Sequence, residues 1–324
     1  MNMLEYLSQF LRCPDDAAMI APLPGALICV ACRRHFPLED GNLISMVSRE
    51  PARLAEDTSY AEGYLAARAD CDPAAPPSWS IGSERRGRLF ACKRRQVEQV
   101  RALIAEDRPE LDVVADFSAG PGYYTLEFAK QWRYVIHCDL CAGSIAQARR
   151  AAREAGIGNI LYLRMDYLRP AFRHSAPRII CLDTLIRGRE HERALAASIH
   201  QSLAPNGAAV IDFHNWWHNP FRRAGLLPDN FIHNRSYALH ELPPLLAAAG
   251  ISSYETIPFH QELDPASGLY SLLARLLPPT RWMYRVKSCH PAEYSSYTTD
   301  TANPEARTMP SARKPISSSP AATR

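Results

Sequence analysis

The sequence has no long apolar run and no strong excess of charge of either sign. No stretch approaches the ~18 apolar residues that a membrane-spanning helix needs. Residues 1–7 lack a basic segment followed by an apolar one, so we expect no signal peptide and a cytoplasmic location. The net charge of +3 is too small for whole-protein electrostatics to favour or exclude nucleic acid. These absences predict no membrane partner and leave the oligomeric state open.

Two nucleotide-binding fingerprints are also missing from the glycine-rich segment 118–122. No Gly-Lys-Ser or Gly-Lys-Thr follows this segment, which excludes a P-loop. A dinucleotide-binding G-x-G-x-x-G counted from Gly120 requires a third glycine at the position of Thr125. The segment therefore matches neither fingerprint.

Apolar runs alternate with helical patterns through the middle of the chain. With 324 residues, 47% of them hydrophobic, the sequence suffices for one large α/β domain and a smaller module. Strands are expected at 113–116, 134–139, 159–166, 177–183, 208–214, 254–259 and 282–286, and helices at 144–154, 190–203 and 239–249. This alternation predicts βαβ units and a doubly wound parallel sheet, with ligands at the carboxyl ends of its strands.

The segment 113–129 is the central feature of this pattern. It begins as an apolar strand that ends in an acid, passes through small residues, and resumes with Leu126 and Ala129 at helical spacing. The small residues at 118, 119, 120 and 122 let the backbone approach a ligand closely, and the following helix start offers unpaired N–H groups. The loop is therefore a candidate cradle for a nucleotide cofactor.

The first 50 residues predict a small ribbon that is built on two knuckles. Cys13 opens the first knuckle, and Cys29 and Cys32 form a CxxC pair in the second, a half-site that tetrahedral Zn²⁺ favours. Asp16 stands where the first knuckle would have its second cysteine. Three alternatives remain open: a site of Cys13, Asp16, Cys29 and Cys32, a fourth ligand from His35, or a ribbon without metal.

The residues of this ribbon resemble the Trm112-like family. The resemblance rests on Leu11-Arg12-Cys13-Pro14 and on the segment 28–44, which is similar to the family's C-x-x-C ending with its aromatic-Pro and Asp-Gly pairs. Some members lack part of the cysteine set. The resemblance implies a zinc ribbon that is associated with a methyltransferase, either as a separate subunit or fused to it.

The segment 111–288 resembles the class I S-adenosylmethionine-dependent methyltransferases. The loop fits their (D/E)-x-G-x-G-x-G signature, with Ser118 and Ala119 where a glycine and a small residue are usual. Acids at the ends of the second and third strands stand where such enzymes bind the ribose hydroxyls and the adenine amino group. The resemblance implies a seven-stranded Rossmann-like sheet and these cofactor-binding residues: Asp116, Ser118, Ala119, Gly120, Gly122, Asp139 and Asp166.

Two side chains at strand ends are candidates for the transfer step. Asp183 ends the fourth expected strand and His214 the fifth, nearest to where the transferred methyl group is expected. A histidine is able to act as a base at neutral pH without much tuning. His218 and His233, in an aromatic and basic segment that follows, are the alternatives. This segment, 215–236, is expected to lie above the strand ends as a lid.

The acceptor stays open between two classes. No Asn-Pro-Pro-Tyr follows the fourth strand, which argues against amino-group methylation of adenine or glutamine, and no Pro-Cys or Thr-Cys nucleophile stands at the strand ends. An aromatic lid suits a small molecule, and it suits a stacked base equally well. We therefore expect transfer to an O, N or C atom of a small molecule, with methylation of an rRNA or tRNA base, the ribbon binding the RNA, as the alternative.

Four segments follow from these patterns. The ribbon occupies 1–50, a helical linker or lid segment 51–110, the methyltransferase domain 111–288 and a disordered tail 289–324. The tail is expected from its richness in Ser, Thr, Pro and Ala.

Overall fold

The computed structural model describes residues 2–50, 84–105, 113–184, 189–214, 237–259 and 281–287. The expected lid 215–236 and tail 289–324 lie outside these residues. Of the expected linker 51–110, only residues 84–105 are described. Within the described segments, no helix is both long and apolar enough to cross a membrane.

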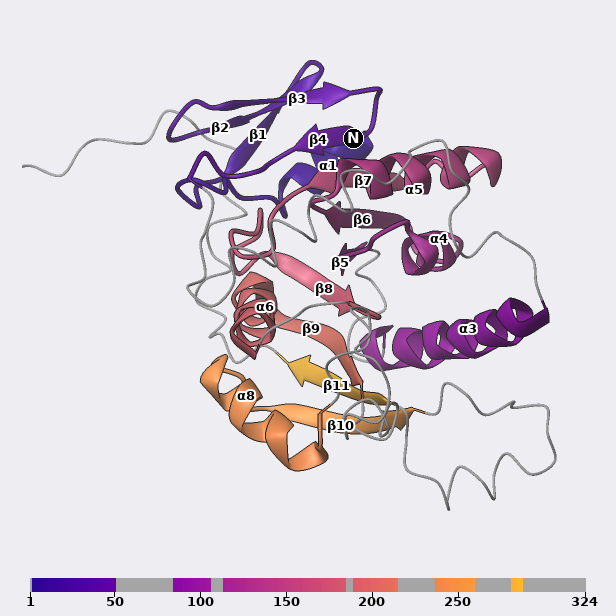
Figure 1. The fold of residues 1–324 in the computed structure, drawn as a ribbon. Coiled ribbons are helices and arrows are strands. Elements are labelled where there is room, and N and C mark those ends of the chain that lie inside the picture. The colour runs from indigo at the N-terminus through magenta and orange to yellow at the C-terminus, as the bar shows by residue number, and fades with distance from the viewer. Residues whose placement is uncertain are drawn as a thin grey trace, which may run out of the picture.

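Eleven strands form one sheet in the order β1-β2-β3-β4-β7-β6-β5-β8-β9-β11-β10 (Figure 1). Seven of them, from β7 to β10 in this order, make the predicted doubly wound sheet, parallel except for β11. Their bounds are β5 Val113–Phe117, β6 Tyr134–Asp139, β7 Ile160–Arg164, β8 Ala176–Cys181, β9 Leu203–His214, β10 Tyr254–Phe259 and β11 Arg281–Lys287. The predicted fold class is therefore confirmed.

Helices cover both faces of this sheet (Figure 1). One face packs against α3 Glu84–Ala105, α4 Tyr123–Ala129 and α5 Ala142–Glu154. The other packs against α6 Arg189–Ser202 and α8 Leu242–Ala248, which follows the short 3-10 turn η2 Leu239–Glu241. Because successive side chains of a strand point to opposite faces, Val114 and Asp116 of β5 lie on the α4 side.

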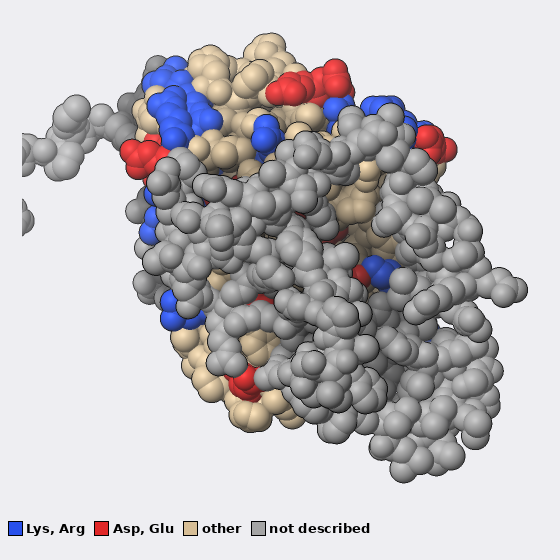
Figure 2. Space-filling view, in the orientation of Figure 1, with Lys and Arg blue, Asp and Glu red and all other residues tan. Residues whose placement is uncertain are grey.

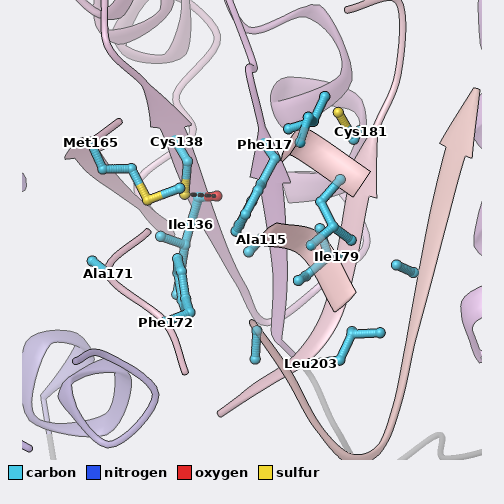
Figure 3. Packing of buried hydrophobic residues seen from close by; sticks show 14 of the residues in the cluster. Ala115, Phe117, Ile136, Cys138, Met165, Ala171, Phe172, Ile179, Cys181 and Leu203 are labelled. Carbon is cyan, nitrogen blue, oxygen red and sulfur yellow. Dashed lines mark hydrogen bonds between the residues drawn. The ribbon is translucent and has the colours of Figure 1, made fainter. Parts of the chain in front are cut away.

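The opposite face of β5 contributes Ala115 and Phe117 to an apolar core. Phe117 packs on Phe172 with ring centroids 5.5 Å apart, and Figure 3 shows Ile136, Cys138 and Ile179 beside them. This core holds β5 between β6 and β8 and so fixes where the strand ends.

The strand β9 begins earlier than its sequence pattern predicts. We expected a helix to 203 and a strand from 208, whereas Leu203 already pairs with Ala176 of β8. The register between the two strands then shifts, with Asn206 at φ 60°. A side chain at Gly207 would lie 2.8 Å from the Ala204 carbonyl oxygen, so this bulge needs glycine.

The N-terminal ribbon continues the sheet beyond β7. It consists of α1 Met3–Ser8, β1 Ile20–Leu23, β2 Ala26–Cys29, β3 His35–Glu39 and β4 Leu43–Ser45. β4 pairs in parallel with β7, and the Arg12 N–H donates to the Ala171 carbonyl at 2.8 Å. Leu11 and Phe36 belong to the same buried cluster as Phe117. The ribbon and the doubly wound sheet therefore share one core.

Candidate functional site

The loop after β5 is shaped by three residues in the left-handed region. Ser118, Gly120 and Gly122 have φ of 57°, 56° and 87°. A side chain on Gly122 would lie 2.7 Å from Ala148 Cβ of α5, so only glycine lets the loop lie this close to the helix. Ser118 holds a conformation that costs a non-glycine residue about 1–3 kcal/mol, and the Ala119 N–H donates to the Cys138 carbonyl at 3.0 Å. Contacts to β6 thus hold the loop.

Asp139 faces this loop from the end of β6. Its Oδ2 accepts from the Gly120 N–H at 2.7 Å, and its Oδ1 accepts from the Cys141 N–H at 2.8 Å. Its side chain is partly exposed. Of the predicted cofactor residues, the structure therefore brings Asp139 and Gly120 together, with each carboxylate oxygen accepting from a backbone N–H.

Asp166 lies beyond the end of β7, at the same edge of the sheet as Asp139. Its Oδ1 accepts from the Leu168 N–H at 2.9 Å, and burial raises the pKa of its carboxyl above the ordinary value. Next to it, the Tyr167 hydroxyl lies 2.7 Å from Nδ1 of His191. The Met165 N–H donates to the Asp139 carbonyl at 3.0 Å, which links the two strand ends.

Asp116 is placed differently from the other predicted cofactor residues. It is only 2% exposed and lies beneath the loop, on the face covered by α4. Its Oδ2 accepts from the Thr125 hydroxyl at 2.6 Å, and the same hydroxyl lies 2.9 Å from Nδ1 of His137. Burial raises the pKa of Asp116 to about 7. Thr125, which stands where a dinucleotide fingerprint has its third glycine, is therefore a hydrogen-bonding partner of this acid.

Asp183 follows the end of β8 in a strained conformation. Its φ is 59°, its N–H donates to Asp212 Oδ1 at 2.8 Å, and its carboxylate pairs with Lys93 of α3. β8 ends at Cys181, so Asp183 lies in the turn beyond the strand rather than at its last position. His214 is the last residue of β9, and its side chain lies outside the described residues, as do His218 and His233.

Sequence reasoning missed a polar network that binds α3 to the strand ends. Gln96 is fully buried; its Nε2 donates to Asp212 Oδ2 at 3.0 Å, and its Oε1 accepts from the Tyr124 hydroxyl at 2.8 Å. Lys93, one helical turn earlier, lies over the rings of Tyr123 and Tyr124. The i, i+3 spacing of Lys93 and Gln96 is the sequence feature that could have indicated this network, because it places both side chains on one helix face.

The two knuckles of the ribbon bring their four predicted ligands together. The ligand atoms of Cys13, Asp16, Cys29 and Cys32 all lie within 4.8 Å of one another. Cys13 Sγ and Cys32 Sγ are 3.8 Å apart, and Cys29 Sγ lies 3.4 Å from either oxygen of Asp16. His35 is outside this group, within the part of the chain that the structure describes.

The sequence of the central strands and loop matches a family model. Residues 114–207 match the model described as a methyltransferase domain. No curated protein matches the chain.

The chain is similar to solved methyltransferase structures at low sequence identity. Magnesium protoporphyrin IX methyltransferase from Synechocystis PCC 6803 is 16% identical over 70% of this chain and 94% of its own, with a TM-score of 0.48. Geranyl diphosphate C-methyltransferase from Streptomyces coelicolor A3(2) is 13% identical over 72% of this chain and 99% of its own, with a TM-score of 0.49.

The family match covers β5 from its second residue, the loop of Gly120 and Gly122, and the strand end at Asp139. Residues 114–207 are therefore similar to a methyltransferase domain.

Proposed function

We propose that the enzyme transfers a methyl group from S-adenosylmethionine to an O, N or C atom of a small molecule. The observation that carries this proposal is the placement of Asp139, whose carboxylate is fixed against the Gly120 loop by two backbone N–H groups. A carboxylate held in this way accepts hydrogen bonds from both hydroxyls of a ribose. Asp166, on the same side of the sheet, is the candidate acceptor for the adenine amino group.

The cofactor, when bound, supplies an electrophilic methyl group on a sulfonium. The chain's own residues must then orient an acceptor atom and take its proton where it carries one. Asp183 suits this role because the Asp212 carboxylate and Lys93 hold its backbone and side chain in place. His214 ends the neighbouring strand and is the second candidate base.

The ribbon's charge favours a small acceptor over RNA. Residues 1–50 carry four arginines and no lysine against six acids. Of the arginines, Arg34 is paired with Asp15 at 2.8 Å. Figure 2 shows Lys and Arg side chains mixed with Asp and Glu at the upper end of the molecule. A surface that binds RNA needs a cationic excess to displace counterions from phosphates, and this segment has none.

The ribbon also lies far along the sheet from the candidate bases. β4 joins the sheet at β7, whereas Asp183 and His214 follow β8 and β9, on the other side of β5. With strands about 4.8 Å apart, the five steps from β4 to β9 span about 24 Å. The ribbon is therefore better placed to support the sheet than to present an acceptor.

Methyl transfer from labelled cofactor into a fractionated lysate tests this proposal. We expect label in the small-molecule fraction, and none in RNA or protein above the level seen without enzyme. Label in RNA that falls steeply with added salt would instead support the alternative acceptor. Heat-denatured enzyme is the control for non-enzymatic transfer.

We further propose that the ribbon binds one Zn²⁺ through Cys13, Asp16, Cys29 and Cys32. With Zn–S bonds of about 2.3 Å, two sulfurs of a tetrahedral site lie about 3.8 Å apart, the separation of Cys13 Sγ and Cys32 Sγ. A carboxylate oxygen and a sulfur would lie about 3.5 Å apart, close to the 3.4 Å between Asp16 and Cys29. These two separations therefore match a closed structural site, and all four donor atoms lie within 4.8 Å of one another.

Metal analysis of the purified protein tests the zinc proposal. We expect one zinc per chain after dialysis, weaker retention in Asp16→Ala, and tighter retention in Asp16→Cys, because a thiolate is the better ligand for Zn²⁺. Removal by a chelator is expected to lower the melting temperature, because the metal binds only the folded ribbon. A purified protein that contains no zinc, and whose melting temperature does not change when zinc is added, would contradict the proposal.

A further inference from the structure

A chain of three buried polar side chains lies beneath the cofactor loop. Asp116 of β5 and His137 of β6 are paired across the parallel ladder, and Thr125 of α4 lies between them. Their exposed fractions are 2%, 0% and 0%. Gly122 lies directly above, since a side chain there would come within 3.6 Å of His137 Cε1. The three residues are thus sealed from solvent while they touch the loop that holds the cofactor.

The hydrogen bonds of this chain fix where its protons lie. The Thr125 hydroxyl has one proton, which it donates to Asp116 Oδ2. The 2.9 Å contact to His137 Nδ1 therefore requires that this nitrogen carry a proton and donate it to Thr125 Oγ1. Burial lowers the pKa of His137 to about 3, so the ring is neutral, and its Nε2 has no partner among the described residues. His137 and Thr125 together hold Asp116 as an acceptor.

Among the described residues, no positively charged side chain shifts the pKa of Asp116. Burial raises its pKa to about 7, and the Asp139 carboxylate adds to this rise, while hydrogen bonds from Thr125 oppose it. The neutral His137 lies beside it on the same face, and two thiols on the opposite face of the sheet, Cys138 of β6 and Cys181 of β8, interact with it electrostatically. A cation that arrives at the loop therefore meets a carboxylate without a counter-charge.

We propose that Asp116, held by Thr125 and His137, makes the loop bind S-adenosylmethionine, whose sulfur is positively charged, in preference to S-adenosylhomocysteine, whose sulfur is uncharged. The proposal rests on the proposed function. Methyl transfer breaks the carbon–sulfur bond and leaves the electron pair on sulfur, while the acceptor atom forms the new bond and releases its proton where it carries one. The sulfur thereby loses its positive charge, which leaves with the released proton or with the methylated acceptor. The protonated fraction of Asp116 falls when the donor binds, with the proton released to the solvent, and rises again after the methyl group has left.

Calorimetric titration with S-adenosylmethionine and S-adenosylhomocysteine between pH 5.5 and 7.0 tests this assignment on the unaltered protein. In this range the α-amino groups of both ligands, with a pKa near 7.7–8.0, stay protonated. If the bound cation lowers the pKa of Asp116 by about one unit, donor affinity falls about three- to fivefold from pH 7.0 to 5.5. Product affinity is expected to change much less. Titrations in two buffers of different ionisation enthalpy count the protons released.

Two variants separate this assignment from a merely structural role. Asp116→Asn keeps an oxygen for the Thr125 hydroxyl and removes the titration, so the donor and product curves are expected to become parallel. Thr125→Val removes a hydrogen bond that favours the carboxylate and is expected to move the donor curve to higher pH. Parallel donor and product curves in the unaltered protein would overturn the assignment. Failure of both ligands to bind at every pH would overturn the proposed function itself.

Discussion

Asp139→Ala is expected to lower the affinity for S-adenosylmethionine by at least about 100-fold. Two hydrogen bonds from ribose hydroxyls to a carboxylate contribute about 1.5–3 kcal/mol each, and about 1.4 kcal/mol corresponds to a factor of ten. The substitution also removes the acceptor for the Gly120 and Cys141 N–H groups, so the loop loses one of its contacts with the end of β6. Isothermal titration calorimetry measures the loss.

The matched control for this variant is Glu154→Gln, at the far end of α5. Glu154 is exposed and forms only a 3.8 Å surface pair with Arg150, which is worth little. The affinity of the Glu154→Gln protein for S-adenosylmethionine is expected to equal that of the unaltered protein. An Asp139→Ala protein that binds the cofactor as tightly as the control would remove Asp139 from the site.

Leu11→Ala is expected to destabilise the whole protein by about 2–5 kcal/mol, the range for removing a fully buried leucine side chain. Leu11 is 0% exposed and belongs to the cluster that includes Phe36 of the ribbon and Phe117 of β5. Because the ribbon and the doubly wound sheet share this core, denaturant unfolding followed by circular dichroism and by fluorescence is expected to show one transition, shifted to lower denaturant.

Leu23→Ala is the control for the same change of side chain in the same ribbon. Leu23 is 38% exposed, so its truncation is expected to change stability by no more than about 0.5 kcal/mol. A Leu11→Ala protein with a separate early ribbon transition, and an unaltered main transition, would show that the two parts fold independently.

The segments that form strands and the position of Asp139 were predictable because they depend on local patterns. Each expected strand of the domain appears in the sheet, since alternating apolar strands and helices leave few other arrangements. Asp139 follows directly from its place at the end of the second strand. The knuckle spacing likewise brought Cys13, Asp16, Cys29 and Cys32 together.

The contacts of Asp116 and Asp183 required tertiary structure. The sequence places Asp116 two residues before the loop, but the alternation of β5 turns its side chain to the α4 face, where the β5–β6 register brings His137 beside it. Asp183 pairs with Lys93, 90 residues earlier in the chain. Such pairings depend on how helices dock, which no local pattern specifies.

The continuity of the ribbon with the sheet was likewise not predictable. β4 is three residues long and pairs with β7 more than a hundred residues later. The pairing is completed by side-chain contacts such as Arg149 of α5 with Asp40 at 3.0 Å. A strand this short has little pattern of its own, so its partner is set by the core that both strands cover.

The most direct measurement of the central claim is an amide NMR titration of the labelled protein with S-adenosylmethionine. The Gly120 and Cys141 N–H groups both donate to the Asp139 carboxylate, so they report on any ligand that this carboxylate binds. We predict that these two amide signals shift and saturate together at one cofactor per chain, with little change in the distant ribbon amide of Leu23. Unchanged Gly120 and Cys141 signals at saturating cofactor would contradict the account.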